Sequence, residues 1–293
     1  MMNKFVLLGL FFCTVSHAQI FKDFTLKENT AMNGRKEKFT HLNDVTVYDL
    51  EYHSFDDTFV KGFLITPKDN SKKYPVLIFN RGGNGHYGMV TEPYIVRFLS
   101  KIAAQGYIVI GSQLRGSEGS EGEDEWGGKD IDDVLFLFKI IDELKIADTS
   151  RIAQMGWSRG GVTNFHLLKK TNRIKAAINI AGPADLLSTH RKEMFKVYQH
   201  RIKGYAKDSI AASHRVSPIY QLDSIKNKKV SLLFLHGDKD TSVHIKNSEL
   251  LKAKAKQIGI QSDMITYKGG DHGLMSQIDI VVDDVIGWLK RVL

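Results

Sequence analysis

Residues 156–161 read Gly-Trp-Ser-Arg-Gly-Gly, and they stand between an apolar run at 151–155 and a helix-like run at 162–170. That order predicts a strand, a sharp turn and a helix, in which the turn lifts the hydroxyl of Ser158 out of the backbone at the end of the strand. The glycines on both sides fit such a turn, because a side chain there would clash with the neighbouring strand and helix, and because strained backbone angles favour glycine.

Short apolar runs alternate with amphipathic runs on both sides of this turn. Further strands are expected at residues 76–79, 107–110, 176–180, 230–235 and 264–267. Helices are expected where apolar residues recur three or four positions apart, around 95–102, 131–138, 251–258 and 278–289. This alternation predicts the α/β class, with a mostly parallel central sheet covered by helices on both faces.

The N-terminal part of the chain is patterned differently. Residues 45–52 and 59–65 alternate apolar and polar side chains around a short acidic turn, which predicts an N-terminal antiparallel hairpin. Residues 19–44 are polar and weakly patterned, so we expect a loosely attached lead-in segment there. One α/β domain is expected over residues 45–293, in which the more polar stretch 183–224 forms a helical excursion over one edge of the sheet.

The first 18 residues have the pattern of an export signal. Lys4 precedes an apolar run at 5–13, and small residues at Ser16 and Ala18 occupy the positions that a signal peptidase reads. The apolar run is too short to span a bilayer, which disfavours the alternative of an uncleaved membrane anchor. We expect cleavage near Ala18, export to the periplasm or the medium, no stable membrane anchor, and no disulfides, since the one cysteine lies in this segment.

The composition argues against several classes of partner. The chain carries 41 Lys and Arg against 33 Asp and Glu, a net charge of +8, but its lysines are scattered and no aromatic residues are interleaved with them. We interpret them as solvated helix faces and turns, so nucleic acid is not an expected partner. The histidines show neither His-Glu-x-x-His nor clustered carboxylate spacing, so no metal site and no cofactor are expected.

Three loops that follow predicted strands carry the residue types of nucleophilic catalysis. They contain Ser158, Asp240 and His272, and the carboxyl ends of parallel strands lie at one edge of a sheet. A serine hydroxyl needs a neighbouring base, which His272 can supply, and Asp240 can fix the imidazole tautomer. The order serine, aspartate, histidine along the chain is the one expected of an α/β-hydrolase.

Two of these assignments have competitors nearby in the sequence. Asp238 competes with Asp240 for the role of the acid. His236 and His244 compete with His272 for the role of the base, but His236 ends a strand and is better explained as a structural hydrogen-bonding residue.

An oxyanion formed during acyl transfer needs hydrogen-bond donors that are already aimed at it. The amide of Arg159, directly after the serine, is the first candidate. The second is expected from the glycine-rich loop at 80–85, where Gly83 is preferred and Gly82 is the alternative. This loop lacks the Lys and Ser or Thr of a nucleotide-binding loop, so a phosphate-binding role is disfavoured.

Several motifs, taken together, point to a protein family more specifically than any one of them does alone. They are Arg115-Gly116-Ser117 with Gly119, Trp126-Gly127, Asp130 and Asp133; Arg151-Ile152-Ala153 before Gly156–Gly161; Ser217-Pro218; His236-Gly237 with Asp240 and Val243; and Tyr267 with Gly270 and His272-Gly273. With these motifs the chain resembles, from about Val45 to its C-terminus, the prolyl oligopeptidase family of serine peptidases, within the α/β-hydrolase superfamily. The resemblance implies Ser158 as nucleophile with Asp240 and His272, backbone donors near Gly83 and Arg159, and cleavage of peptides or related acyl compounds without a cofactor.

The chain departs from the family pattern in several places. Arg81 stands where the family often has histidine, and His244 stands where proline is common. No glutamate pair for gripping a peptide's amino end is recognisable. The residues before the hairpin leave no room for the large β-propeller that many family peptidases carry. Arg81 and Arg191 are candidates for contacting an acidic substrate group, against the general preference of arginine for the surface.

The expected function is that of a serine hydrolase that cleaves short peptides or acyl-peptides through an acyl-enzyme. The alternative is a carboxylesterase that acts on small or carbohydrate-linked esters with the same residues. A third hypothesis, a non-catalytic binding protein on a hydrolase scaffold, is disfavoured because all three catalytic residue types are present. The sequence carries no prediction of oligomeric state.

Overall fold

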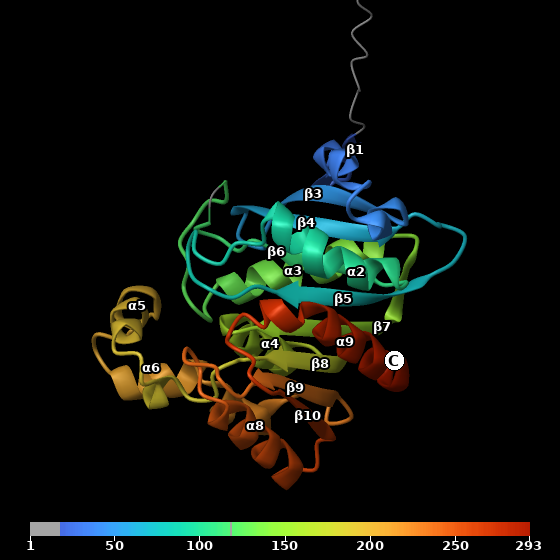
Figure 1. Cartoon of the computed structure of the whole chain (residues 1–293). Helices are drawn as coiled ribbons and strands as arrows, with labels where there is room; N and C mark the ends of the chain where they lie inside the picture. Colours follow the sequence, from blue (N-terminus) through green and yellow to red (C-terminus); the bar gives the residue numbers. More distant parts are fainter. Residues whose placement is uncertain (1–17, 118) are drawn as a thin grey trace, which may run out of the picture.

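The computed structural model describes residues 18–117 and 119–293, and its strands form one ten-stranded sheet (Figure 1). The strands are β1 (Ala18–Ile20), β2 (Phe24–Glu28), β3 (Val45–His53), β4 (Phe59–Pro67), β5 (Tyr74–Asn80), β6 (Ile108–Ser112), β7 (Ala147–Trp157), β8 (Ile174–Ile180), β9 (Ser231–Gly237) and β10 (Ser262–Tyr267). In space they follow the order β1-β2-β3-β4-β6-β5-β7-β8-β9-β10.

Parallel and antiparallel pairing divide the sheet into two parts. The strands from β5 to β10 pair in parallel, whereas β1 to β4 pair antiparallel and β4 joins the parallel part by an antiparallel contact with β6. The hairpin of β3 and β4 runs from the pair Val45 and Pro67 to the pair His53 and Phe59. The predicted mostly parallel sheet and N-terminal antiparallel hairpin are therefore confirmed.

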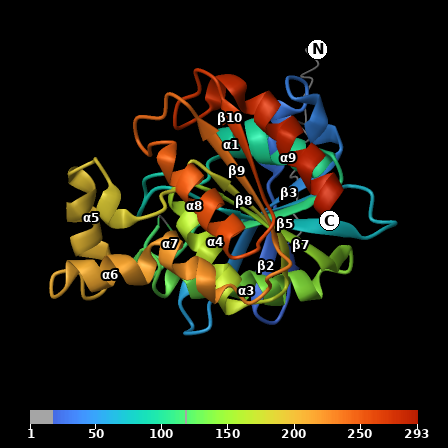
Figure 2. The same ribbon diagram turned by 90° about the horizontal axis from the view of Figure 1, so that it is seen from below.

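Helices cover both faces of the sheet (Figures 1 and 2). The α-helices are α1 (Glu92–Tyr94), α2 (Ser100–Ala104), α3 (Asp130–Glu143), α4 (Arg159–Lys170), α5 (Glu193–Arg201), α6 (Ser209–Val216), α7 (Pro218–Gln221), α8 (Lys246–Gln257) and α9 (Ile278–Val292), and a π-helix at Ile95–Leu99 joins α1 to α2. The buried apolar side chains of α3 and α8, and those of α4 except Val162, belong to one apolar cluster, and those of α2 and α9 belong to another.

Strand β5 explains how one sheet supports two apolar layers. All seven of its residues are buried. Val76 and Ile78 belong to the cluster with α3, and Leu77 and Phe79 belong to the cluster with α9, because successive side chains of a strand point to opposite faces. A strand covered on both faces reads as a continuous apolar run, which is the pattern that the sequence shows here.

The prediction of a loosely attached segment at residues 19–44 is wrong for part of that segment. Strand β2 pairs with β3 along its whole length, from Phe24 opposite Tyr52 to Glu28 opposite Tyr48. Phe24 and Leu26 are buried in the apolar cluster that also contains α3. Two apolar positions in five residues are too few to give a periodic signal, so the strand is defined by its pairing partner. The predicted signal at residues 1–18 lies, except for Ala18, outside the described residues.

The stretch 183–224 contains helices α5, α6 and α7 and carries its own small core. Helices α5 and α6 extend from the body of the molecule beyond the end of the sheet (Figures 1 and 2). Tyr198 of α5 packs edge-on against Trp126, with ring centroids 5.0 Å apart, and both side chains are buried. The excursion is therefore attached to the loop before α3 by aromatic contacts of its own, separate from the two sheet clusters.

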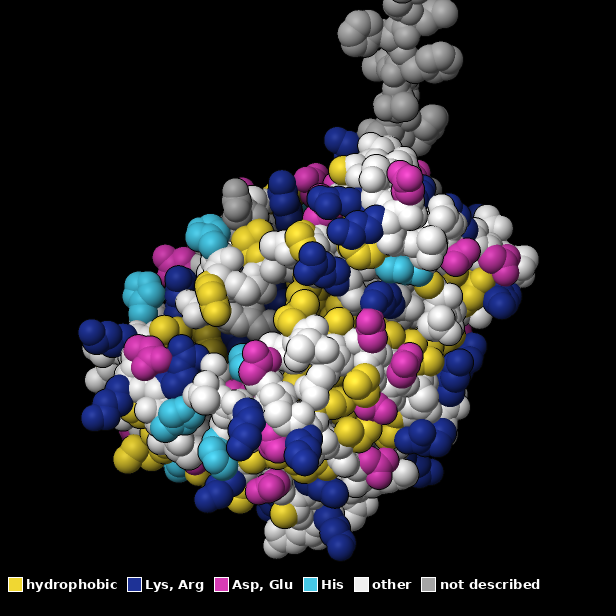
Figure 3. Space-filling view, viewed as in Figure 1, with side chains coloured by type: hydrophobic (Ala, Val, Ile, Leu, Met, Phe, Trp, Pro, Cys, Tyr) yellow, Lys and Arg dark blue, Asp and Glu magenta, His cyan; other side chains and the backbone are white. Residues whose placement is uncertain are grey.

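The surface shown in Figure 3 mixes charges of both signs. Lysine and arginine side chains are spread over this face and are interspersed with acidic and apolar groups. In the described part of the chain, no helix is both long enough and apolar enough to cross a membrane.

Candidate active site

Ser158 occupies a strained turn between β7 and α4. Its backbone angles are φ 54° and ψ −120°, which a residue with a side chain rarely adopts. Glycines make the turn possible: a Cβ on Gly156 would lie 2.1 Å from the carbonyl oxygen of Gly160, and one on Gly160 would lie 1.9 Å from that of Asn80. The Ser158 amide donates to the carbonyl of Ile180, 2.8 Å away on the next strand, so the turn is tied to the sheet.

Asp240 and His272 meet although 32 residues separate them. His272 Nδ1 lies 2.8 Å from Asp240 Oδ2, and the other oxygen, Oδ1, accepts the amides of Ser242 and Val243 at 2.8 and 2.9 Å. The alternative acid, Asp238, is exposed and accepts the amide of Gly269 instead. Of the two candidate acids, the structure therefore brings only Asp240 to the histidine.

His236 is a second partner of the Asp240 carboxylate. Its Nε2 lies 3.2 Å from Asp240 Oδ2 and 2.8 Å from the carbonyl of Val243, and its Nδ1 lies 2.7 Å from the hydroxyl of Ser248. Because a carbonyl can only accept, Nε2 carries a proton, and the ring is held in one orientation. The expectation that His236 is a structural hydrogen-bonding residue fits this geometry.

These contacts set the charge state of Asp240. Burial by itself would raise the pKa of this carboxyl group, but the hydrogen bonds from His236, His272 and the Val243 amide outweigh burial, so the pKa lies well below its usual range. Asp240 is therefore an anion at neutral pH. A charged Asp240 facing Nδ1 favours the tautomer in which that nitrogen carries the proton and Nε2 has the free lone pair.

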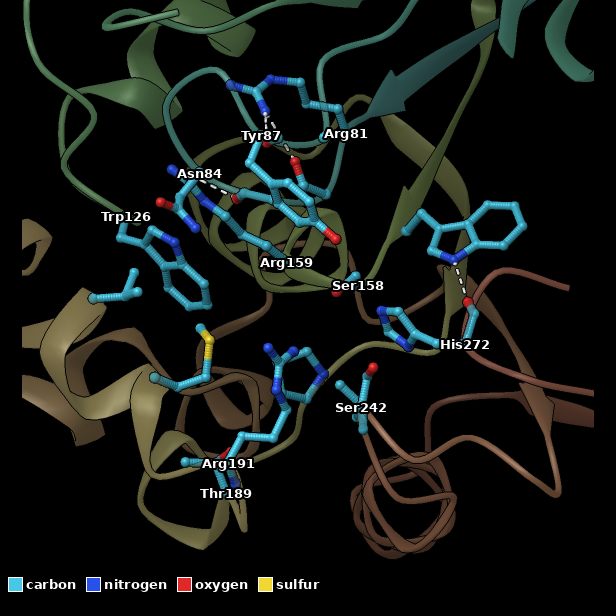
Figure 4. A pocket seen from close by; sticks show the side chains of 18 of the residues that line it. Arg81, Asn84, Tyr87, Trp126, Ser158, Arg159, Thr189, Arg191, Ser242 and His272 are labelled. Carbon is cyan, nitrogen blue, oxygen red and sulfur yellow. Dashed lines mark hydrogen bonds between the residues drawn. The ribbon is translucent and has the colours of Figure 1, made fainter. Parts of the chain in front are cut away.

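Ser158 and His272 line the same cavity, which has a volume of about 450 Å³. Figure 4 shows their side chains next to each other, with His272 on the loop after β10. The indole of Trp157 donates to the carbonyl of His272 at 3.0 Å, so the residue before the serine holds the histidine's backbone close to the turn. His244 also lines the cavity, but its Nδ1 accepts the amide of Lys246.

The glycine-rich loop after β5 packs directly against the serine. A Cβ on Gly82 would lie 3.0 Å from the carbonyl oxygen of Trp157 and 3.2 Å from the Cβ of Ser158, so any side chain there would push against the serine turn. Gly83 has a φ of +71°, and a Cβ there would lie 2.0 Å from the carbonyl oxygen of Tyr87. Neither the Gly83 amide nor the Arg159 amide donates to another described residue, and Arg159 opens α4, where amides lack intrahelical partners.

Arg81 does not face the substrate space in the way proposed for it. Its side chain is buried, and all five N–H groups of its guanidinium are used within the protein. They donate to the carbonyls of Gln113, Gly82, Tyr87 and Gly85 and to the hydroxyl of Ser117. Burial lowers the pKa of Arg81 to about 10, with a further contribution from the charge of Arg159. Arg81 therefore holds the glycine-rich loop in shape and has no donor left for a substrate.

The Arg159 side chain forms a buried ion cluster that sequence analysis missed. It donates to both oxygens of Asp124 at 2.6 and 2.5 Å, to Asp130 at 2.9 Å, and to the carbonyl of Gly83 at 3.1 Å. Asp124 also accepts the amide of Gly85 at 2.8 Å. Burial would raise the pKa of Asp124, but Arg159 outweighs it and the pKa is about 2. The cluster thus joins the serine turn to the glycine-rich loop that supplies the predicted oxyanion donor.

No group of three or more His, Cys, Asp or Glu side chains in residues 18–117 and 119–293 is arranged to hold a metal ion.

Comparison with known proteins identifies the family. The sequence profile of the Prolyl oligopeptidase family matches residues 95–293. The chain belongs to this family. A second profile, Acetyl xylan esterase (AXE1), matches residues 19–134. As a member of the prolyl oligopeptidase family the chain is a serine-type hydrolase with an α/β-hydrolase fold.

The chain is also similar to curated relatives and, in its fold, to solved structures. The chain is 28% identical over 202 residues to "Uncharacterized peptidase YtmA" of Bacillus subtilis, covering 68% of this chain and 76% of the relative. It is 27% identical to "Uncharacterized peptidase YuxL" of the same organism, covering 85% of this chain but 39% of that protein. The Pyrococcus horikoshii acylaminoacyl peptidase has the same fold, with a TM-score of 0.72 at 20% identity, over 94% of this chain and 49% of that one.

Proposed function

We propose that this family member cleaves short peptides or acyl-peptides by acyl transfer through Ser158, with His272 as general base and Asp240 as its partner. The observation that supports this most is the 2.8 Å contact between His272 Nδ1 and Asp240 beside a serine on a strained turn. The Ser158 hydroxyl and the His272 imidazole line one cavity, and the Asp240 anion lies behind the imidazole. This arrangement activates an otherwise weak nucleophile.

The order of proton transfers follows from the His272 tautomer in which Nε2 has the free lone pair. His272 Nε2 removes the proton from Ser158 Oγ as this oxygen bonds to the substrate's carbonyl carbon, and Asp240 stabilises the resulting imidazolium. The carbonyl oxygen becomes an anion that the amides of Gly83 and Arg159 are proposed to bind. His272 returns the proton to the leaving amine as the C–N bond breaks, and water repeats the sequence on the acyl-enzyme.

Replacing the nucleophile tests the proposal directly. Ser158→Ala is expected to lower kcat for an aminoacyl-nitroanilide by about 10⁴-fold or more, because the residues of such a triad act as a unit. It is also expected to abolish labelling by a fluorophosphonate probe. The control is Ser71→Ala, in an exposed loop, which should retain both. Full activity in the Ser158 variant would refute the assignment.

A second candidate activity is that of a carboxylesterase acting on small or carbohydrate-linked esters. The match of residues 19–134 to the acetyl xylan esterase profile favours it. Esters are intrinsically easier to cleave than amides, so ester hydrolysis alone does not separate the two functions. Amide hydrolysis of a matched ester and amide pair by the wild-type protein, lost in Ser158→Ala, would support the peptidase; ester hydrolysis alone would favour the esterase.

We also propose that the protein is exported after cleavage behind Ala18. The support is the basic residue Lys4 followed by the apolar run at 5–13. N-terminal sequencing of the protein recovered outside the cytoplasm should begin at Gln19, and a mature protein that begins at Met1 would contradict export by this route.

A further inference from the structure

Arg191 extends into the cavity from the segment between β8 and α5. In Figure 4 its guanidinium rises from this segment towards the side of the cavity that holds Ser158. Its Nε donates to Glu193 Oε1 at 2.7 Å. Its two terminal nitrogens make no hydrogen bond to any residue in 18–117 or 119–293, so four N–H donors remain for a ligand.

The terminal nitrogens of the other two arginines of the cavity wall, and one nitrogen of His190, are already engaged. Arg81 and Arg159 are buried, and the terminal nitrogens of both guanidinium groups donate within the protein. His190 Nε2 donates to the carbonyl of Thr241 at 2.7 Å. Among the described residues that line the cavity, Arg191 is thus the arginine whose two terminal nitrogens are both open.

The acidic side chains of the cavity wall leave room for an incoming anion. Asp185 Oδ1 accepts the amide of Leu187 at 3.0 Å and the hydroxyl of Ser217 at 3.3 Å, so this carboxylate is engaged at the start of a short helical turn. Glu193 accepts a hydrogen bond from Arg191 Nε alone, and its side chain is 61% exposed to solvent. Glu193 therefore orients the guanidinium and leaves its terminal fork open.

We infer that Arg191 determines specificity by binding a carboxylate of the substrate within the cavity that holds Ser158. A guanidinium fork matches the two oxygens of a carboxylate, and such charge-assisted pairs are stronger than neutral hydrogen bonds. This inference rests on the proposed function and narrows it to acidic substrates. The carboxylate comes either from the C-terminus of a short peptide or from an acidic side chain, and the experiment distinguishes these two sources.

The experiment compares matched substrates. N-acetylated tripeptides are prepared with a free or an amidated C-terminus, and a second set exchanges Glu for Gln at each position. In one of the two sets, the wild-type kcat/KM is expected to be at least about 10-fold higher for the charged peptide than for its neutral counterpart. A 10-fold ratio is the effect expected of one charge-assisted hydrogen bond that is partly exposed to water. Preference in the first set identifies the terminal carboxylate, and preference in the second identifies a side chain.

Variants at the arginine then assign the preference. Arg191→Gln is expected to remove the discrimination mainly by raising KM for the charged peptide, while kcat/KM for the neutral peptide changes less than about 3-fold. Arg191→Lys should retain part of it, since lysine keeps the charge but lacks the planar fork. Lys192→Gln, which removes the neighbouring exposed charge outside the cavity wall, is the control and should behave as wild type.

Two results would overturn the inference. One is a wild-type enzyme that does not distinguish charged from neutral peptides, and the other is an Arg191→Gln variant that loses activity equally on both. Calorimetric binding of the same peptides to the Ser158→Ala variant separates this inference from the proposed function. A charge preference in binding that depends on Arg191, without hydrolysis by the wild type, would refute the catalytic proposal and leave the recognition site standing.

Discussion

At the scale of single residues, the charge of Asp240 is the feature on which the site depends. The carboxylate is buried, yet it remains an anion because two imidazoles and two backbone amides point at it. Oδ1 accepts hydrogen bonds from the two backbone amides, and Oδ2 contacts the imidazoles of His236 and His272. With both oxygens engaged, the carboxylate is kept from rotating. Because His272 faces Asp240 through Nδ1, its Nε2 points away from the carboxylate, which is the orientation that a general base requires.

Asp240→Asn is expected to lower kcat by about 10³–10⁴-fold with little change in the fold. The amide is nearly isosteric, but it removes the anion that fixes the His272 tautomer and stabilises the imidazolium. Steady-state kinetics and a circular dichroism spectrum of the same preparation check this. Asp238→Asn is the matched control and should stay within a few-fold of wild type, and the reverse ranking of the two variants would assign the acid to Asp238.

At the scale of elements, the excursion of α5 and α6 rests on a separate aromatic contact. Tyr198 is buried between Trp126 and Tyr205, with ring centroids at 5.0 and 6.1 Å. Segments held by a small satellite cluster open more readily than a central core does. The excursion carries part of the cavity wall, including Met194, so its local stability affects the shape of the substrate space.

Tyr198→Ala is therefore expected to loosen the excursion and leave the sheet intact. Truncating a large buried aromatic ring costs about 3–5 kcal/mol where the surroundings cannot collapse. Hydrogen exchange should become faster in α5 and α6, while amides of α3 should exchange as in wild type. Tyr220→Ala, which removes a more exposed ring from α7, is the control. Equal acceleration in α3 would show that the excursion unfolds only with the whole domain.

At the scale of the whole molecule, buried ion pairs make stability depend on pH. The pKa of Asp124 is about 2 in the folded protein, below the usual value of 3.8. A lowered carboxyl pKa contributes stability that is complete above the unfolded value and disappears as the pH falls through the folded value. For Asp124 this window lies between pH 4 and pH 2, and its contribution at neutral pH is about 2 kcal/mol.

Asp124→Asn is expected to lower the free energy of unfolding at pH 7 and to flatten its decline between pH 4 and pH 2. Urea unfolding at pH 7, 4 and 3 measures both effects. The exposed Asp23 supplies the control, and Asp23→Asn should follow the wild-type curve. If Asp124→Asn kept the full wild-type slope below pH 4, the acid sensitivity would have to come from other carboxyl groups.

The chain's local patterns were sufficient for the strand, turn and helix around Ser158, the mostly parallel pairing of the sheet, and the position of Asp240 and His272 in loops at one edge. These features depend on periodicities and turn residues within about ten positions, which a sequence displays directly. Strand β2 was not predicted because its two buried residues are too few to form a periodic pattern, and the strand is defined only by its pairing with β3.

The surroundings of the reactive groups depended on three-dimensional packing. Arg159 reaches Asp124 across 35 residues and the carbonyl of Gly83 across 76, and Arg81 is surrounded by backbone carbonyls. A carbonyl oxygen is the same in every residue, so no residue type signals such a contact. Arg81 and Arg191 look alike in the sequence, and only folding leaves one fully hydrogen-bonded inside the protein and the other with open donors in the cavity.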